Sequence, residues 1–182
     1  MIEVRFHGRG GQGAVTSAEL VALAAISEGK YAQSFPSFGP ERRGAPVQSF
    51  TRVSDEPIRL RYGINKPDVV VVLDPALLVV GGALNGLKEK GILVVNTRKS
   101  LADIKKEFSL SCRTAVVDAT KIAREILGLP ITNTTMIGAL VKATGIVQME
   151  ALVEPLRHRF GRIAEKNIQA CQRAFKETIV EK

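Results

Sequence analysis

Cysteine, histidine and tryptophan are scarce in this chain of 182 residues, which has two cysteines, two histidines and no tryptophan. Cys112 and Cys171 are far apart and form no Cys-x-x-Cys pair. The chain therefore lacks the Cys₄ ligand set of an iron–sulfur cluster and the cysteine framework of a disulfide-rich protein. His7 and His158 belong to no cluster of histidines and cysteines, so the ligand spacings of zinc sites are missing too. We expect no metal site in this chain.

Long hydrophobic runs are also missing. No run approaches the roughly 20 apolar residues that a membrane-spanning helix needs, and the run at residues 69–73 fits a buried strand. Met1 leads directly into a strand-like segment, without the basic and apolar regions of a signal peptide. These features predict a cytoplasmic protein with no membrane partner, in which both cysteines stay reduced and act as small buried hydrophobes.

Positive charge exceeds negative charge, since 26 lysines and arginines against 18 acidic residues give a formal net charge of +8. Such a surplus can indicate nucleic-acid binding, but here the arginines are not interleaved with aromatic side chains that could stack on bases. We expect no nucleic-acid partner, although a basic nucleic-acid-binding module stays an alternative. The same charge suits an anionic cofactor or an acidic protein partner.

The most informative segment is glycine-rich and lies between a predicted strand at residues 2–7 and a predicted helix at residues 14–28. Its residues are Gly8, Arg9, Gly10, Gly11, Gln12 and Gly13. Glycines in this number indicate turns with positive φ, or bare N–H groups that contact a ligand. At the start of a helix, such N–H groups and the helix dipole favour an anion, most often a phosphate. Alternatively, the glycines only allow the strand and the helix to pack closely.

The spacing of Gly8, Gly10 and Gly13 also matches the Gly-x-Gly-x-x-Gly pattern of dinucleotide-binding proteins. Those proteins need an acidic residue about 20 residues further on, which binds a ribose hydroxyl. Here the corresponding region has no carboxylate until Glu41, which directly precedes Arg42. Another phosphate carrier is therefore a better candidate than NAD. A stand-alone NAD(P)-dependent oxidoreductase, with Arg42 on a 2′-phosphate, stays an alternative.

The hydrophobic pattern alternates between strands and helices along the chain. We expect a loop at residues 31–44, two short strands at residues 46–53 and 57–61, and further strands at residues 68–73, 91–95 and 114–117. Helices are expected after Asp74, at residues 119–127 and 136–143, and in a long final helix with Ala164, Ile168, Cys171, Phe175 and Ile179 on one face. This order predicts a single α/β domain over residues 1–182, a three-layer Rossmann-like sandwich with a mostly parallel sheet and a helical C-terminal third.

Ligands of such folds bind at the carboxyl ends of strands. The sequence places the glycine-rich segment, Asp74 and the pair Asn96-Thr97 there. No catalytic residue is predicted, because serine, histidine and acidic residues occur in no nucleophile motif. His7, at the end of the first predicted strand, is interpreted as a hydrogen-bonded scaffold group rather than as a catalytic base.

A second unusual segment comprises Phe38, Gly39, Pro40, Glu41, Arg42, Arg43 and Gly44. Two glycines bracket the adjacent arginines, which indicates a shaped turn that presents both charges. The alternative is a pair of ordinary surface arginines.

These segments together are similar to the gamma subunits of 2-oxoacid:ferredoxin oxidoreductases. Residues 7–13 resemble the opening motif of that family, and residues 35–46, which read Phe-Pro-Ser-Phe-Gly-Pro-Glu-Arg-Arg-Gly-Ala-Pro, resemble its second signature. The third signature is matched by Asn133, Met136, Gly138 and Ala139, and Asn167 fits the last helix. The resemblance covers essentially the whole chain in order, and it is greatest to the pyruvate-specific branch.

The resemblance implies one part of an enzyme that reversibly converts pyruvate and coenzyme A into acetyl-CoA, CO₂ and electrons for ferredoxin. It implies alpha, beta and delta partners, with thiamine diphosphate and magnesium in alpha and beta and 4Fe–4S clusters in beta and delta. This chain would then hold no cofactor alone and would be inactive in isolation. The gamma part is similar to a domain implicated in coenzyme A binding. The predicted binding residues are Gly8, Arg9, Gly10, Gly11, Gln12, Gly13, Phe38, Gly39, Arg42, Arg43, Gly44, Asn96 and Asn133.

Overall fold

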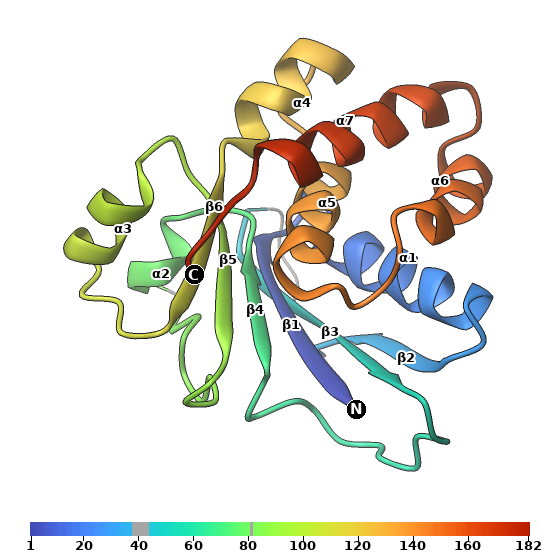
Figure 1. Ribbon diagram of the computed structural model, residues 1–182, viewed down its shortest axis with the longest axis horizontal. Coiled ribbons are helices and arrows are strands. Elements are labelled where there is room, and N and C mark those ends of the chain that lie inside the picture. The colour runs from blue at the N-terminus through green and yellow to red at the C-terminus, as the bar shows by residue number, and fades with distance from the viewer. Residues whose placement is uncertain (38–43, 81) are drawn as a thin grey trace.

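The computed structural model describes residues 1–37, 44–80 and 82–182, and in these residues seven strands form one sheet with helices on both faces (Figure 1). The strands are β1 (Ile2–Arg9), β2 (Tyr31–Pro36), β3 (Pro46–Ser54), β4 (Val69–Val72), β5 (Ile92–Asn96), β6 (Arg113–Val117) and β7 (Ile179–Val180). The α-helices are α1 (Ala14–Ser27), α2 (Leu77–Val80), α3 (Leu101–Glu107), α4 (Ala119–Leu127), α5 (Asn133–Thr144), α6 (Val153–Phe160) and α7 (Ala164–Glu177).

The strand order is β2-β3-β1-β4-β5-β6-β7. The central strands β1, β4, β5 and β6 run parallel to one another, whereas the hairpin β2–β3 and the short β7 add antiparallel edges. All residues of β4 are buried valines, as a central parallel strand with both faces covered requires. The predicted α/β class, the parallel strands in the centre of the sheet and the helical C-terminal third are confirmed.

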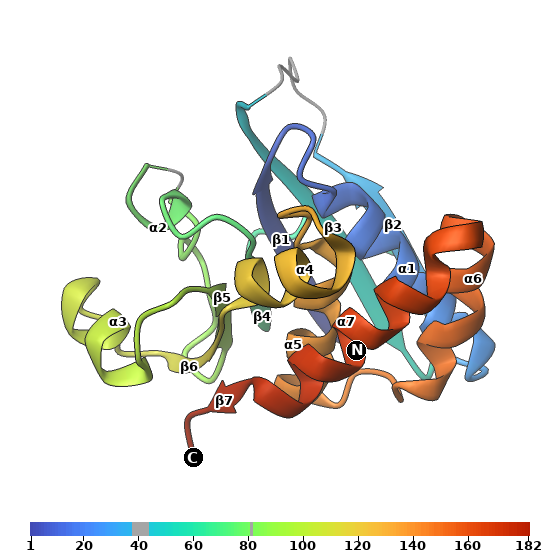
Figure 2. The same cartoon turned by 90° about the horizontal axis from the view of Figure 1, so that it is seen from above.

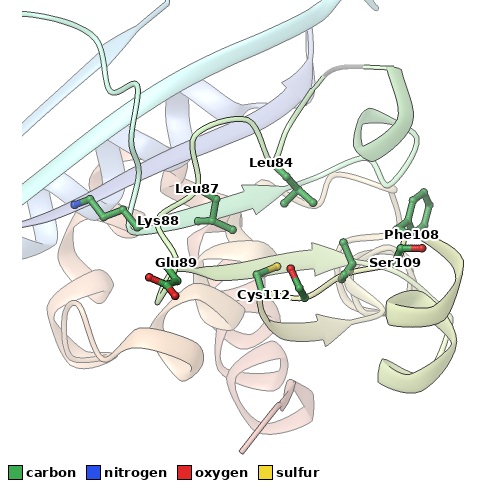
Figure 3. A pocket seen from close by; sticks show the side chains of 9 residues that line it. Leu84, Leu87, Lys88, Glu89, Phe108, Ser109 and Cys112 are labelled. Atoms are coloured by element: carbon green, nitrogen blue, oxygen red, sulfur yellow. The ribbon is translucent and has the colours of Figure 1, made fainter.

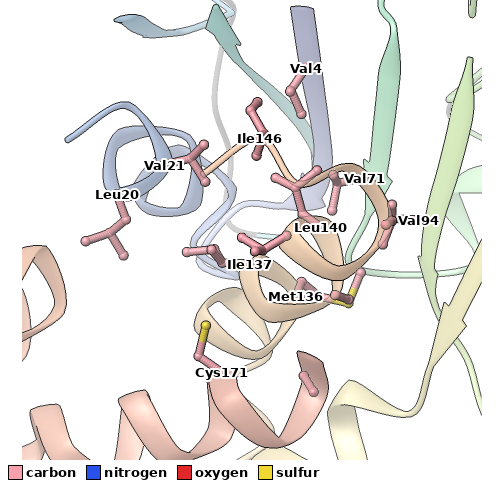
Figure 4. Close-up of a cluster of buried hydrophobic side chains, with 14 of the residues drawn as sticks. Val4, Leu20, Val21, Val71, Val94, Met136, Ile137, Leu140, Ile146 and Cys171 are labelled. Atoms are coloured by element: carbon pink, nitrogen blue, oxygen red, sulfur yellow. The ribbon is translucent and has the colours of Figure 1, made fainter. Parts of the chain in front are cut away.

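The larger hydrophobic core lies between the sheet and the layer formed by α1, α5 and α7 (Figures 1 and 4). Helix α5 occupies its centre, where Met136, Ile137 and Leu140 are inaccessible to solvent. Helices α5 and α7 cross so closely that a Cβ atom on Gly138 would lie 2.0 Å from the carbonyl oxygen of Cys171. Only a glycine permits this backbone contact.

A smaller core covers the opposite face of β4, β5 and β6. Val70 and Val72 pack there with Leu77 of α2 and Ile104 of α3. These helices form the third layer, so the predicted three-layer arrangement is confirmed (Figure 2). Across the described parts of the chain, no helix is long and apolar enough to cross a membrane.

The loop predicted at residues 31–44 is wrong in its first half, where the chain forms the edge strand β2. This strand pairs antiparallel with β3. The Phe35 ring of β2 lies 5.2 Å, centroid to centroid, from the Phe50 ring of β3, and such cross-strand aromatic pairs stabilise a sheet. Tertiary pairing therefore decides the conformation of a segment whose local composition favours a loop.

The strand predicted at residues 57–61 is also wrong, because these residues form no strand. The segment begins with a proline, which has no N–H group for a sheet ladder. Side chains hold it instead. The Gln33 side-chain amide donates to the Ile58 carbonyl at 3.2 Å, and the fully buried Arg52 donates to the Tyr62 carbonyl at 2.8 Å.

Two helix predictions are corrected at one end. The helix expected directly after Asp74 begins three residues later, at α2, because the Asp74 carboxylate accepts the N–H of Ala76 at 3.0 Å and closes a separate turn. The final helix ends before Ile179, which pairs with Val116 of β6 in the antiparallel strand β7. This pairing gives the otherwise open edge of β6 its hydrogen-bond partner.

Candidate functional site at the carboxyl edge of the sheet

The glycine-rich segment forms a closed turn between β1 and α1. Gly8 and Arg9 belong to β1, which extends two residues further than predicted. The turn closes because the Gln12 N–H donates to the Arg9 carbonyl at 2.9 Å, while the Arg9 N–H donates to the Gln12 side-chain oxygen at 2.7 Å. Gly11 and Gly13 have φ angles of +92° and +82°, which non-glycine residues rarely adopt.

The start of α1 offers backbone N–H groups to a ligand. Gly13 is the N-cap and provides no side-chain hydrogen bond, and the first turn contains no acidic residue. The N–H groups of Ala14, Val15 and Thr16 have no acceptor within the helix, because the first turn of any helix leaves them unpaired. Ala14, Val15 and Thr16 line an open hollow of about 280 Å³, together with Arg9. This hollow, the turn hollow, has the donors and the dipole sign that favour an anion.

The described end of the second motif lies directly against this turn. The Gly10 N–H donates to the Ala45 carbonyl at 2.9 Å, and the Gly44 N–H donates back to the Gly10 carbonyl at 3.2 Å. The Arg9 guanidinium donates to the Gly44 carbonyl at 3.2 Å. The two motifs are therefore brought together in space at Gly44. The predicted site residues Phe38, Gly39, Arg42 and Arg43 lie outside the described residues.

An ion pair joins the turn to the end of β4. The Nε of Arg9 lies 2.5 Å from the Asp74 carboxylate, and both side chains are largely screened from solvent. Strand β4 is the parallel neighbour of β1, so the carboxyl ends of the two strands meet at one edge of the sheet, where the sequence placed Asp74. The Asp74 carboxylate is engaged by Arg9 and is not free to bind a ribose.

A second hollow of about 280 Å³ lies at the carboxyl ends of β1, β4 and β5, and we call it the switch-point hollow. Strand β1 leads into α1 on one face of the sheet and β4 leads into α2 on the other, and such a topological switch point is the usual ligand site of α/β folds. Gln12, Asp74, Asn96, Thr120 and Thr132 contribute its polar groups. The sequence did not indicate Thr120 or Thr132, which no motif marks.

The side-chain amide of Asn96 forms hydrogen bonds within the protein. Its Nδ2 donates to the Leu73 carbonyl and to the Thr120 hydroxyl, both at 2.9 Å, and its Oδ1 accepts the Thr120 N–H at 3.3 Å. Both amide hydrogens are thus engaged. Asn96 fixes the end of β4 and the start of α4, so an effect on a ligand would be indirect.

Asn133 lies against the glycine-rich turn, as predicted for a residue of the same site. A Cβ atom on Gly13 would lie 2.7 Å from its Nδ2 atom. Its backbone carbonyl accepts the Ser17 hydroxyl of α1 at 3.3 Å. The side-chain Oδ1 is buried without a hydrogen-bond partner, and such an orphaned acceptor is rare in folded proteins.

His7 is part of the scaffold. The Nε–H of Arg5 donates to its Nε2 atom at 2.9 Å, so this nitrogen carries no proton. Burial and the Arg5 charge lower the pKa of His7 to about 4. Arg5 also donates to the Ala83 carbonyl at 3.0 Å, which ties a loop to the sheet. A neutral imidazole held in this way agrees with its interpretation as a scaffold group.

A larger hollow, of about 500 Å³, lies at the opposite end of the sheet, and its walls include Leu84, Leu87, Phe108 and Cys112, which precede β5 and β6 (Figure 3). Lys88, Glu89, Ser109 and Ser111 make its walls polar as well as apolar, and no sequence motif reaches it. No group of three or more His, Cys, Asp or Glu side chains that could hold a metal occurs among the residues for which the structure gives positions.

Comparison with known proteins adds three findings. The family model described as pyruvate ferredoxin/flavodoxin oxidoreductase matches residues 3–177. The chain is 55% identical over 182 residues to the pyruvate/ketoisovalerate oxidoreductases common subunit gamma of Thermococcus kodakarensis, covering 99% of this chain and 98% of that protein. It is 49% identical over 178 residues to the pyruvate synthase subunit PorC of Methanothermobacter marburgensis, covering 97% of each.

A solved structure agrees with the sequence relatives. The crystal structure of pyruvate oxidoreductase subunit PORC from Thermotoga maritima superimposes with a TM-score of 0.89 at 40% sequence identity, covering 100% of this chain and 98% of that one. The described fold therefore has a counterpart of nearly the same length.

Proposed function

Because the chain belongs to the pyruvate ferredoxin/flavodoxin oxidoreductase family, we propose that it is the gamma subunit of a pyruvate:ferredoxin oxidoreductase. In this role it supports the reversible oxidative decarboxylation of pyruvate with coenzyme A to acetyl-CoA, CO₂ and reduced ferredoxin. The names of the relatives support this assignment, since they are subunits of pyruvate oxidoreductases and of pyruvate synthase.

The reactive centres belong, in this proposal, to other subunits. Alpha and beta subunits hold thiamine diphosphate and magnesium, beta and delta subunits hold 4Fe–4S clusters, and ferredoxin accepts the electrons. Cys112 and Cys171 are the only cysteines of the chain, and a Cys₄ ligand set needs more. We place the complex in the cytoplasm, where both thiols stay reduced.

The part of this chain is to bind coenzyme A at the turn hollow. The observation that carries this proposal is the uncapped start of α1 beside Arg9, at a turn closed by glycines with positive φ. Coenzyme A carries a diphosphate and a 3′-phosphate, and backbone N–H groups together with a guanidinium bind such anions. Arg42 and Arg43 directly precede Gly44 in the sequence. We propose that their charges contact the same phosphates.

Arginine substitutions in the assembled complex test this role. Arg9→Ala removes one charge-assisted contact, worth about 1.5–3 kcal/mol, and should raise the Michaelis constant for coenzyme A roughly 10- to 100-fold. The constant for pyruvate should stay unchanged. Arg113→Ala is the control, because Arg113 is exposed at the start of the central strand β6, at the opposite edge of the sheet. If both substitutions raise the Michaelis constant for coenzyme A equally, the arginines act through a diffuse electrostatic field, which would contradict a specific binding site.

The second motif is tested in the same way. Replacing Arg42 or Arg43 by alanine should also raise the constant for coenzyme A, and lysine should restore only part of the loss, because a point charge replaces a bidentate fork. Arg59→Ala and Arg61→Ala serve as controls. If both pairs of substitutions change the Michaelis constant for coenzyme A equally, Arg42 and Arg43 are ordinary surface charges.

A second candidate concerns the 2-oxoacid. The Thermococcus kodakarensis relative is named as a subunit common to pyruvate and ketoisovalerate oxidoreductases. By analogy, this chain would serve a branched-chain 2-oxoacid enzyme as well. Purification through this chain, followed by assays with pyruvate and with ketoisovalerate, decides between one complex and two.

A further inference from the structure

Apolar side chains gather at the carboxyl edge of the sheet, on segments that leave them in solvent. Val79 and Val80 of α2 are 72% and 74% exposed, the highest values among the large hydrophobic side chains of the described residues. In the connection between α4 and α5, Leu129 and Ile131 are 56% and 46% exposed. Single exposed hydrophobics are ordinary, whereas a group at one edge of the molecule marks an interaction surface.

The two segments flank the same hollow. Pro75, which leads into α2, and Pro130, which stands between Leu129 and Ile131, both line the switch-point hollow. Figure 2 shows α2 and the connection from α4 to α5 toward the end of the molecule at which β1 passes into α1. The segments that carry the exposed valines and the exposed Leu129 and Ile131 therefore both border one polar depression.

The local structure does not require these exposed side chains. Helix α2 has only four residues, too short to be stable by itself. Leu77 anchors it in the smaller core, and the partly buried Leu78 packs against that core. Val79 and Val80 add nothing to that core. In the other segment, the Ile131 N–H donates to the Leu129 carbonyl at 2.9 Å, and this tight turn directs both side chains away from the core. A partner that covers these side chains explains why both segments expose them.

We propose that this edge, defined by Val79, Val80, Leu129 and Ile131, docks against the oxidoreductase subunit that carries the reaction centre. The choice of partner rests on the proposed function. If the phosphates of coenzyme A lie in the turn hollow, its thiol must reach a centre on another chain, because the sequence predicts no catalytic residue in this one. The subunit with that centre must then cover the edge on which the hollows open.

Charge favours a different chain over a second copy of this one. Arg98 at the end of β5 is 71% exposed and lies 3.9 Å from its nearest carboxylate, Asp118. Lys121, in the first turn of α4, is exposed at the same edge. Two copies with a net charge of +8 would bring these basic margins together, and like charges across an interface are unfavourable. The complementary partner face is apolar in the centre and acidic at its margin.

Paired aspartate substitutions test the docking surface in the reconstituted complex. The full chain with Val79→Asp and Val80→Asp is combined with the other subunits, and its dissociation is followed by sedimentation and native mass spectrometry. We expect at least a 10-fold weaker association. Ile163→Asp with Ile179→Asp is the matched control, because these residues are 56% and 59% exposed and the change in charge is identical. It should leave assembly unchanged. Thermal melting of each free chain checks that it is folded.

A photo-crosslinking residue at position 80 identifies the partner in the same complex. A crosslink to the subunit with the reaction centre supports the proposal. A crosslink only to another subunit or to a second copy of this chain overturns it, as does unchanged assembly of the Val79 and Val80 variant or equal weakening by the control. The coenzyme A role is scored separately, with Arg9→Ala. Arg9→Ala could leave the Michaelis constant for coenzyme A unchanged while the aspartate substitutions weaken association of the chain with the complex. That result would support the docking surface and contradict the coenzyme A role.

Discussion

Replacing Gly13 by alanine is expected to destabilise the protein for two separable reasons. The residue has a φ of +82°, and a side chain in this left-handed region costs about 1–2 kcal/mol. Its new Cβ would also lie 2.7 Å from the Nδ2 of Asn133. Asn133 is 5% exposed, so it has little room to move, and such overpacking costs about 1–3 kcal/mol. The two effects together lower the free energy of unfolding by about 2–5 kcal/mol.

Gly11→Ala separates the two contributions. Gly11 has a φ of +92° in the same turn, but a Cβ atom there would meet nothing within 4 Å. Gly11→Ala should therefore lower the free energy of unfolding only by the cost of the backbone conformation, about 1–2 kcal/mol. Combining Gly13→Ala with Asn133→Ala should recover part of the steric contribution, with a coupling of about 1–3 kcal/mol between the two sites.

Urea unfolding of the four variants provides these free energies, with the denaturant slope checked for constancy. Gly13→Ala must be clearly less stable than Gly11→Ala. Equal stabilities of these two variants, or additive effects of Gly13→Ala and Asn133→Ala, would refute the contact between the turn and α5.

Three further outcomes are expected. The free energy of unfolding should fall by about 3 kcal/mol as the pH drops from about 6.5 to about 4, because unfolded His7 binds a proton that the native state, with its pKa lowered to about 4, does not; urea titrations across this range should show a flatter profile for His7→Gln. Asn96→Ala should lower stability by about 1–3 kcal/mol with little change in the Michaelis constant for coenzyme A, and the reverse pattern in melts and kinetics would make Asn96 a ligand residue. The isolated chain should bind no stoichiometric iron and sulfide after anaerobic reconstitution, because Cys112 and Cys171 cannot complete a cluster; a visible absorption band of a cluster would contradict this.

Signals that are local in the sequence predicted their elements well. The buried valines of β4 and the helix α4 were found because burial on both faces and capping leave direct marks. Helix α4 begins where the Asp118 carboxylate accepts the Lys121 N–H at 2.9 Å, and it ends at Gly128 with a φ of +77°. The glycine-rich turn was found for the same reason, since positive φ angles require glycine.

Contacts between distant segments could not be read from the chain. The pairing of Arg9 with Asp74 joins residues 65 positions apart, on either side of the hairpin β2–β3, so no local pattern indicates it. The packing of Asn133 on Gly13 likewise depends on how α5 sits in the fold. The opposite error concerned residues 57–61, which were predicted as a strand. No strand forms there, and the Gln33 side chain supplies a hydrogen bond to the Ile58 carbonyl that a strand partner would have given.

The crossing of α5 and α7 makes one thiol a reporter of local opening. Cys171 is completely buried at this crossing, and burial raises its pKa to about 12, so almost no reactive thiolate forms while the helices stay packed. Cys112 is only partly buried and provides a reference in the same molecule. The ratio of their alkylation rates therefore measures how often α7 separates from α5, without any added probe. It would also show whether assembly with partner subunits suppresses that motion.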